Sequence, residues 1–68
     1  MTIREERLRL FVRSQARKGI AVGPTQISSY MGWNSARMNS IPGWATKIRQ
    51  EELAAAGFVK INGRWQLP

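Results

Sequence analysis

Asn62 and Gly63, near the end of the chain, limit the fold more than any other pair of residues. They stand between two apolar-rich segments, and Asn-Gly in that setting is the strongest short-range signal for a β-hairpin. The type I′ turn that joins such strands needs positive φ at both central residues, which Asn and Gly tolerate best. We therefore predict a hairpin over residues 58–67.

The two-residue turn also sets the register of the predicted hairpin. Cross-strand geometry predicts three opposed pairs: Ile61 with Arg64, Lys60 with Trp65, and Phe58 with Leu67. Phe58, Trp65 and Leu67 should then share a face that packs on the first and third helices. Arg64 should project from the tip, where it either contacts DNA or only protects an exposed strand edge from aggregation.

The composition argues against catalysis and against metal binding. The 68 residues include no cysteine and no histidine, so thiolate ligands, disulfides and the usual neutral-pH base are absent. The only acids are four glutamates in two adjacent pairs, Glu5-Glu6 and Glu51-Glu52, and neighbouring residues on a helix do not face each other. We expect a single small domain that is not an enzyme and needs no cofactor.

The charge points to a polyanionic partner. Eleven lysines and arginines against four glutamates give a formal charge of +7, which favours association with nucleic acid and, second, with an anionic membrane surface. A solvated basic surface on a small partner-binding protein is the plain alternative. No apolar run is long enough to span a membrane, and the first ten residues do not resemble a signal peptide, so we expect a cytoplasmic protein.

The first predicted helix covers residues 3–18. Thr2 and Glu5 have the spacing of a capping box, in which each side chain accepts a hydrogen bond from the other residue's backbone. Apolar residues recur on one face: Leu8, Phe11, Val12 and Ala16, with Leu10 extending the arc. Arg9, Arg13 and Arg17 repeat every four residues on the other side, as a solvated face or as auxiliary contacts to phosphate groups.

Glycine and proline divide the rest of the chain. A second helix is predicted over residues 25–31, with Thr25 as N-cap and Gly32 as its end. Residues 20–22 before it are either a lone strand or an apolar plug. An extra turn is predicted near 35–41, and a third helix over 42–56, because proline is favoured at a first helical position. Ser40 or Ile41 would cap this third helix, and Gly57 would end it. A start near Asn34 is the alternative.

This order of elements resembles the winged helix-turn-helix family of DNA-binding domains. "TQISSYMGWNS" (25–35) is similar to the second helix and turn of that motif, and "IRQEELAAAGFVKINGRWQL" (48–67) to the end of its recognition helix and its wing. The resemblance implies an α+β, mostly α fold: a three-helix winged helix-turn-helix with a C-terminal β-hairpin wing. The chain departs from the pattern around "MNSIPGW", where it is longer than the family usually is.

The resemblance implies sequence-specific binding of double-stranded DNA. Base-contacting candidates are Thr46, Lys47 and Gln50 on the outer arc of a late-starting third helix, or Arg37 and Asn39 if that helix starts early. Candidates for phosphate or wing contacts are Arg49, Lys60, Arg64, Arg13 and Arg17. The size is typical of phage or plasmid regulators and of recombination or replication accessory factors. The alternatives are an RNA-binding or ribosome-associated module and a protein-interaction winged helix.

The expected partner is therefore duplex DNA in the cytoplasm, where the protein would be nucleoid-associated. We expect no membrane and no small-molecule ligand, and a second copy of the chain could join on DNA. Oligomeric state, target sequence and the sign of any regulation are left open by the sequence. Trp33, Trp44 and Trp65 could stack on the bases of single strands, but in so small a core they are better explained as buried anchors.

Overall fold

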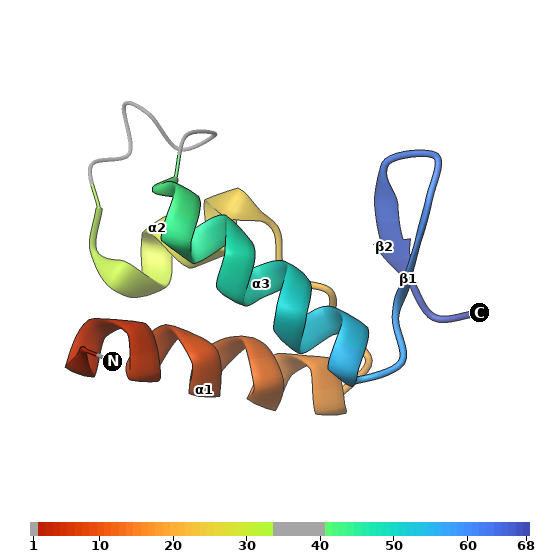
Figure 1. Cartoon of the computed structure of the whole chain (residues 1–68), viewed down its shortest axis with the longest axis horizontal. Helices are drawn as coiled ribbons and strands as arrows, with labels where there is room; N and C mark the ends of the chain where they lie inside the picture. Colours follow the sequence, from red (N-terminus) through yellow and green to blue (C-terminus); the bar gives the residue numbers. More distant parts are fainter. Residues whose placement is uncertain (1, 34–40) are drawn as a thin grey trace.

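Three helices are followed by a two-stranded antiparallel hairpin in the computed structural model, which describes residues 2–33 and 41–68 (Figure 1). The elements are α1 (Ile3–Arg17), α2 (Pro24–Met31), α3 (Gly43–Ala55), β1 (Val59–Ile61) and β2 (Arg64–Gln66). α3 lies across α1, and the hairpin stands beside the C-terminal half of α3. This mostly helical architecture matches a helix-turn-helix with a β-hairpin wing, which confirms the predicted fold class.

The capping box predicted for α1 is present. Thr2 Oγ1 accepts a hydrogen bond from the Glu5 backbone at 3.1 Å, and Glu5 Oε1 accepts one from the Thr2 backbone at 3.0 Å. Two of the backbone N–H groups at the start of the helix, those of Thr2 and Glu5, are therefore satisfied by side chains. The helix ends at Arg17, and the chain then turns through Gly19, whose φ is +82°.

The start of α2 differs from the prediction by one residue. Gly23 rather than Thr25 is the N-cap, because Pro24 occupies the first helical position and brings the start forward. Gln26 Oε1 accepts a hydrogen bond from the Gly23 backbone at 2.9 Å, which replaces the expected threonine cap. Gly32 ends the helix in the left-handed conformation, as predicted.

α3 starts late, close to the preferred prediction. Pro42 is the N-cap, with φ −56° and ψ 150°, so Gly43 is the first helical residue. The prediction that Ser40 or Ile41 caps the helix is therefore wrong. Because Pro42 has an extended ψ, the helix starts at Gly43, one residue after the predicted start at Pro42. Of the extra turn predicted over 35–41, residues 35–40 lie outside the described part, and Ile41 is not helical.

The core lies between α1 and α3 and is closed by α2 and the segment after α1. Its buried members are Leu8, Val12, Ala16, Val22, Ile27, Ala45, Ile48, Leu53 and Phe58. Val22 comes from the 20–22 segment, which forms no strand and acts as an apolar plug. Trp33 and Trp44 are half-buried, and their rings meet edge to face with the ring centroids 5.8 Å apart. Both side chains therefore serve as packing anchors.

The hairpin has the predicted turn and register. Asn62 and Gly63 have φ values of 52° and 79°, and Lys60 pairs with Trp65. Phe58 is buried and Trp65 is half-buried against the core, but Leu67 is 52% exposed, so its predicted packing on the helices is wrong. β2 ends at Gln66, and Leu67 therefore lies beyond the strand ladder.

Candidate nucleic-acid interface

The side of α3 that faces away from the core carries small and polar residues. Ala45, Ile48, Glu52 and Leu53 are buried on the inner side of the helix. The opposite side consists of Thr46, which is half-buried, and Lys47, Gln50 and Ala54, which are exposed; we call these four residues the α3 outer face. Their spacing of three and four residues places them in one row along the helix. The three base-contacting candidates of the late-starting helix therefore lie together.

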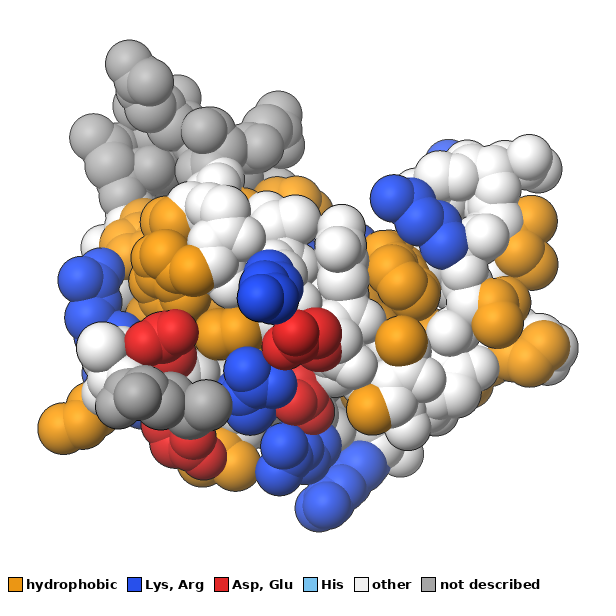
Figure 2. Space-filling model, in the orientation of Figure 1, with side chains coloured by type: hydrophobic (Ala, Val, Ile, Leu, Met, Phe, Trp, Pro, Cys, Tyr) orange, Lys and Arg blue, Asp and Glu red, His pale blue; other side chains and the backbone are white. Residues whose placement is uncertain are grey.

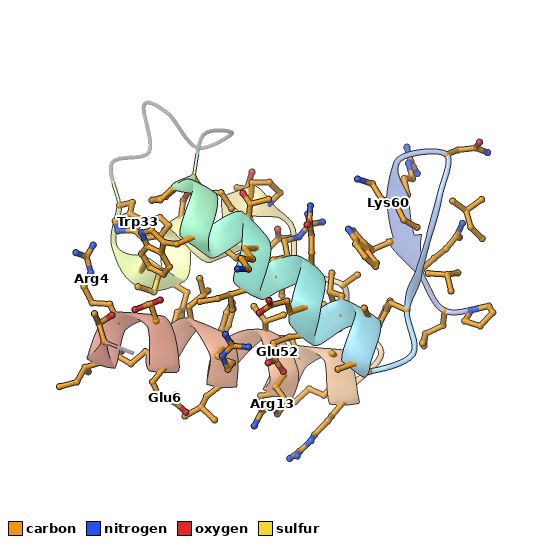
Figure 3. All side chains as sticks on the ribbon, in the orientation of Figure 1. Arg4, Glu6, Arg13, Trp33, Glu52 and Lys60 are labelled. Atoms are coloured by element: carbon orange, nitrogen blue, oxygen red, sulfur yellow. The ribbon has the colours of Figure 1, made fainter. Side chains whose placement is uncertain are left out.

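The hairpin adds two cations on its two faces. Lys60 lies opposite Trp65 in the ladder and Arg64 opposite Ile61, so the pleat sends the two charged side chains to opposite faces. Lys60 extends from β1 toward the side on which α3 lies (Figure 3). Both side chains belong to exposed residues. Lys60 is thus nearer to the α3 outer face, whereas Arg64 projects beside the turn.

Arg49 links α3 to the segment between α1 and α2. Its Nε donates a hydrogen bond of 2.6 Å to the backbone carbonyl of Val22. Burial lowers the pKa of the Arg49 guanidinium, which remains charged at neutral pH because the starting value is so high. Arg49 therefore fixes the position of α3, and its terminal nitrogens are the part that could meet a phosphate group.

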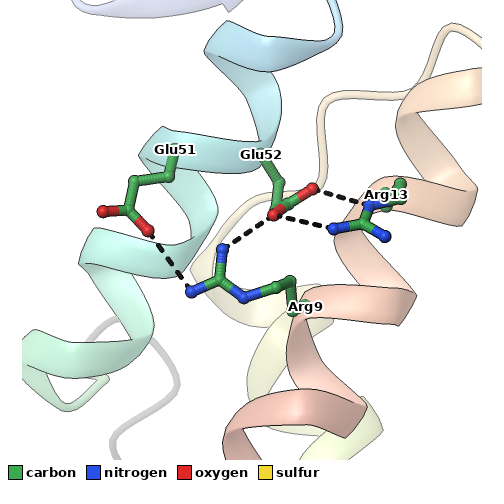
Figure 4. Close-up of polar contacts among 4 residues, drawn as sticks. All are labelled: Arg9, Arg13, Glu51 and Glu52. Carbon is green, nitrogen blue, oxygen red and sulfur yellow. Dashed lines mark hydrogen bonds and ion pairs between the residues drawn. The ribbon is translucent and has the colours of Figure 1, made fainter. Parts of the chain in front are cut away.

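Two glutamates of α3 are held by two arginines of α1, in what we call the α1–α3 ion-pair cluster (Figure 4). Arg9 Nη1 lies 2.8 Å from Glu52 Oε2, and Arg9 Nη2 lies 3.4 Å from Glu51 Oε1. Arg13 Nε and Nη2 donate to the two carboxylate oxygens of Glu52 at 3.0 and 3.3 Å. Glu52 is only 7% exposed. The cluster therefore compensates a nearly buried carboxylate from two sides.

The cluster changes the assignment of the arginine stripe on α1. Arg13, predicted as a phosphate contact, is hydrogen-bonded to Glu52 beneath α3 and is not part of the α3 outer face (Figure 3). Arg17 is exposed in the last turn of α1, the helix that packs against the inner side of α3. The structure therefore brings Thr46, Lys47 and Gln50 together on one side and leaves these two arginines apart from them.

The distribution of charge follows from the cluster. In Figure 2 the carboxylate atoms lie over α1 and α3, and the hairpin shows only basic charges. Glu51 and Glu52 face arginines, so they contribute little uncompensated negative charge beside the α3 outer face. Lys47, Lys60 and Arg64 make no ion pair within residues 2–33 and 41–68. Part of the positive surplus is therefore available on α3 and the hairpin, and the rest lies on α1, where Arg4, Arg7 and Arg17 also make no ion pair among the described residues.

Arg37 and Asn39, the candidates of the early-starting helix, lie outside the described residues.

The ion pairs between α1 and α3 were not predicted, although the sequence carried a signal for them. Glu52 adjoins Leu53 on the inner arc of the helix, and a carboxylate at a core-facing position needs a cationic partner. What sequence alone could not supply is the alignment of α1 that brings Arg9 and Arg13 to it.

Acid should weaken the fold through Glu52. The hydrogen bonds from Arg13 and then Arg9 hold the pKa of this carboxyl below its ordinary value, although burial opposes them. In the unfolded chain the pKa of a glutamate is about 4.3, and in the folded protein the pKa of Glu52 is lower. The stabilisation is therefore complete above the unfolded pKa and is lost as the pH falls through the folded pKa. We expect the free energy of unfolding, measured with urea, to drop steeply below about pH 4.3.

The matched variants for this pH prediction are Glu52→Gln and Glu51→Gln, which remove the same charge from adjacent positions. Glu52→Gln should cost about 1–3 kcal/mol at neutral pH and flatten the acid dependence. Glu51→Gln should behave like the wild type, because Glu51 is half-exposed at its side chain and makes one longer contact. Equal acid profiles for the wild type and Glu52→Gln would contradict the assignment.

The described residues hold no group of three histidine, cysteine or acidic side chains able to bind a metal ion. Among the same residues, no helix has the length and apolar character needed to cross a bilayer. Comparison with protein-family models, with curated proteins and with solved structures found no match to this chain.

Proposed function

We propose that this protein binds double-stranded DNA in a sequence-specific manner, with the α3 outer face in the major groove and the hairpin as a wing on the flanking backbone. The observation that carries the proposal is the row formed by Thr46, Lys47 and Gln50 beside the cationic hairpin, with the neighbouring glutamates held by arginines. Within this proposal the chain is a winged helix-turn-helix protein, and its role is that of a small transcriptional regulator or a recombination or replication accessory factor.

The chemistry of the α3 outer face suits base edges. An α-helix with its side chains is about 10–12 Å across and fits the major groove of B-DNA, which is about 12 Å wide. Gln50 can form two hydrogen bonds with adenine, and Lys47 can donate to guanine. Thr46 can contact a thymine methyl group, while Ala54 is small enough to let the helix approach closely. No apolar side chain larger than alanine interrupts this row.

The cations around this face suit the phosphate backbone. Lys60 faces α3 (Figure 3), whereas Arg64 lies on the other face of the hairpin, beside the turn, so each face of the wing presents one cation. Arg49 is anchored to the Val22 carbonyl and holds its remaining donors at a fixed place. Phosphate contacts of this kind set the position of a protein on DNA, and base contacts set its specificity.

Binding should depend strongly on salt. If Lys47, Arg49, Lys60 and Arg64 each neutralise one phosphate, a plot of log K against log salt should have a slope of about −4. Fluorescence anisotropy with a labelled duplex over a series of salt concentrations measures this slope. Affinity that stays constant across the series would contradict the proposal.

Arg64→Ala is the matched test of the hairpin's role. Arg64 is exposed, so its replacement should change the free energy of unfolding by no more than about 0.5 kcal/mol. It should weaken duplex binding and reduce the salt slope by about one if its contact is a phosphate. Full duplex affinity in this variant would mean that the hairpin only closes the core through Phe58 and Trp65.

A further inference from the structure

The side of α1 that faces away from α3 exposes large apolar side chains. Ile3 is 81% exposed and Leu10 is 51% exposed. Seven residues separate them, which is about two helical turns, so they lie on one stripe. Three polar residues lie on the same stripe. We call this surface the α1 outer stripe; it consists of Ile3, Arg7, Leu10, Ser14 and Arg17. Figure 2 shows hydrophobic atoms along this lower edge of the molecule.

An acid that makes no ion pair among the described residues borders this stripe. Glu5 accepts a hydrogen bond in the capping box, and Glu51 and Glu52 are held by arginines. Glu6 makes no ion pair within the described residues, and it points away from α3, on the same side as the α1 outer stripe (Figure 3). The stripe itself carries two basic residues, Arg7 and Arg17, neither of which makes an ion pair among the described residues, and Glu6 lies at its edge. The Arg7 guanidinium lies over the Tyr30 ring of α2, 5.6 Å from the ring centroid.

We propose that the α1 outer stripe binds the same stripe of a second copy of this chain, with the two α1 helices antiparallel. Leu10 is the middle residue of α1, which runs from Ile3 to Arg17. A two-fold axis at this point therefore brings Leu10 against Leu10 of the second copy and Ile3 against the stem of Arg17. Isologous contacts of this kind are the commonest basis of protein dimers.

The charges on α1 match this antiparallel arrangement. With Leu10 on the axis, Glu6 lies opposite Ser14 of the second copy, between Arg13 and Arg17 of that copy. Arg13 is already shared with Glu52, so Arg17 is the available partner for Glu6. This pairing of opposite charges supports the antiparallel arrangement.

The dimer should be weak in free solution. Each copy carries a formal charge of +7, so two copies repel each other at long range, and the apolar contact is limited to two Ile and two Leu side chains. Salt screens this repulsion. Self-association should therefore become stronger as salt is raised, which is the opposite of the salt dependence expected for DNA binding.

The dimer would have a consequence for DNA that rests on the proposed function. α3 packs against the buried side of α1, which carries Leu8, Val12 and Ala16, and the α1 outer stripe lies on the other side of that helix. The α3 outer face likewise lies on the side of α3 away from its own buried residues. Pairing through α1 consequently leaves two α3 outer faces on opposite sides of the dimer. Such a dimer would bridge two DNA segments rather than contact adjacent half-sites of one duplex.

Sedimentation equilibrium without DNA, from micromolar to millimolar protein, tests the dimer independently of DNA binding. We compare the wild type with Leu10→Asp and with Leu67→Asp, which makes the same change at an equally exposed leucine outside the α1 outer stripe, beyond the end of β2. Wild type and Leu67→Asp should self-associate alike, and Leu10→Asp should associate at least about tenfold more weakly, because each dimer loses two leucine contacts. A wild type that stays monomeric throughout, or equal association of all three proteins, would overturn the proposal.

Oxidative cross-linking tests the two-fold axis, because the chain contains no cysteine of its own. Leu10→Cys should form a disulfide-linked dimer much faster than Leu67→Cys, since only residues on the axis meet their own copies. Equal rates would overturn the antiparallel arrangement.

A capture experiment tests whether the dimer bridges two DNA segments. An immobilised duplex should capture a second, labelled duplex in the presence of the wild type or Leu67→Asp but not in the presence of Leu10→Asp. If all three proteins bind a single duplex and Leu10→Asp bridges as well as the wild type, the dimer is not the bridging unit.

Discussion

Leu53→Ala should destabilise the protein more than any other single change considered. Leu53 is fully buried between α1 and α3, and its backbone carbonyl accepts the Phe58 N–H at 3.0 Å where the chain leaves the helix. Truncation of a buried leucine to alanine costs about 2–5 kcal/mol, against a total stability of roughly 5 kcal/mol for a domain of this size. The thermal midpoint should fall by at least about 8 °C.

Leu67→Ala is the matched control for this change. It removes the same atoms from a leucine that is 52% exposed, so its thermal midpoint should stay close to that of the wild type. Circular dichroism melts of the three proteins at equal concentration give the comparison. Equal losses in the two variants would mean that Leu53 is not a core residue and that the packing of α3 on α1 is wrong.

Replacement of Lys47 and Gln50 by alanine should remove most sequence-specific DNA binding while leaving the fold intact. Each single change should cost about 1–3 kcal/mol on a preferred site and relax the preference at one base pair. Both residues are exposed, so the free energy of unfolding should change by no more than about 0.5 kcal/mol. Competition binding with preferred and scrambled duplexes separates the loss of specificity from the loss of charge.

Arg4→Ala serves as the control for charge, because it removes one cation near the start of α1, far from the hairpin (Figure 3). It should lower affinity slightly for every duplex and leave the preference between sequences unchanged. If Thr46, Lys47 and Gln50 variants discriminate between duplexes as the wild type does, while Arg37 and Asn39 variants fail, the base contacts come from the segment before α3.

Local signals in the sequence predicted most of the backbone. The capping box of Thr2 and Glu5, the end of α2 at Gly32 and the Asn62-Gly63 turn each depend on residues within four positions of one another. Such features are nearly independent of the rest of the fold, which is why they could be recognised. The errors at the starts of α2 and α3 come from Pro24 and Pro42, which fix the boundary in slightly different ways.

Contacts between distant elements were harder to predict. The packing of Glu52 against Arg9 and Arg13 joins residues about forty positions apart, and it depends on how α3 lies across α1. Leu67 illustrates the same limit, because alternation along the strand predicted a position on the face of Phe58 and Trp65, but β2 ends one residue earlier, at Gln66. The row of Thr46, Lys47 and Gln50 was predictable because helical periodicity alone defines it.

Selection of bound sequences from a random duplex library, with a matched RNA pool as control, tests the central claim most directly. We expect one enriched duplex motif with the wild type, loss of that enrichment with the Lys47→Ala, Gln50→Ala double variant, and no comparable enrichment from the RNA pool. Preferential recovery of RNA would support an RNA-binding module instead. Recovery of neither pool above background would contradict nucleic-acid recognition by the α3 outer face and would leave an acidic protein as the partner of the basic surface.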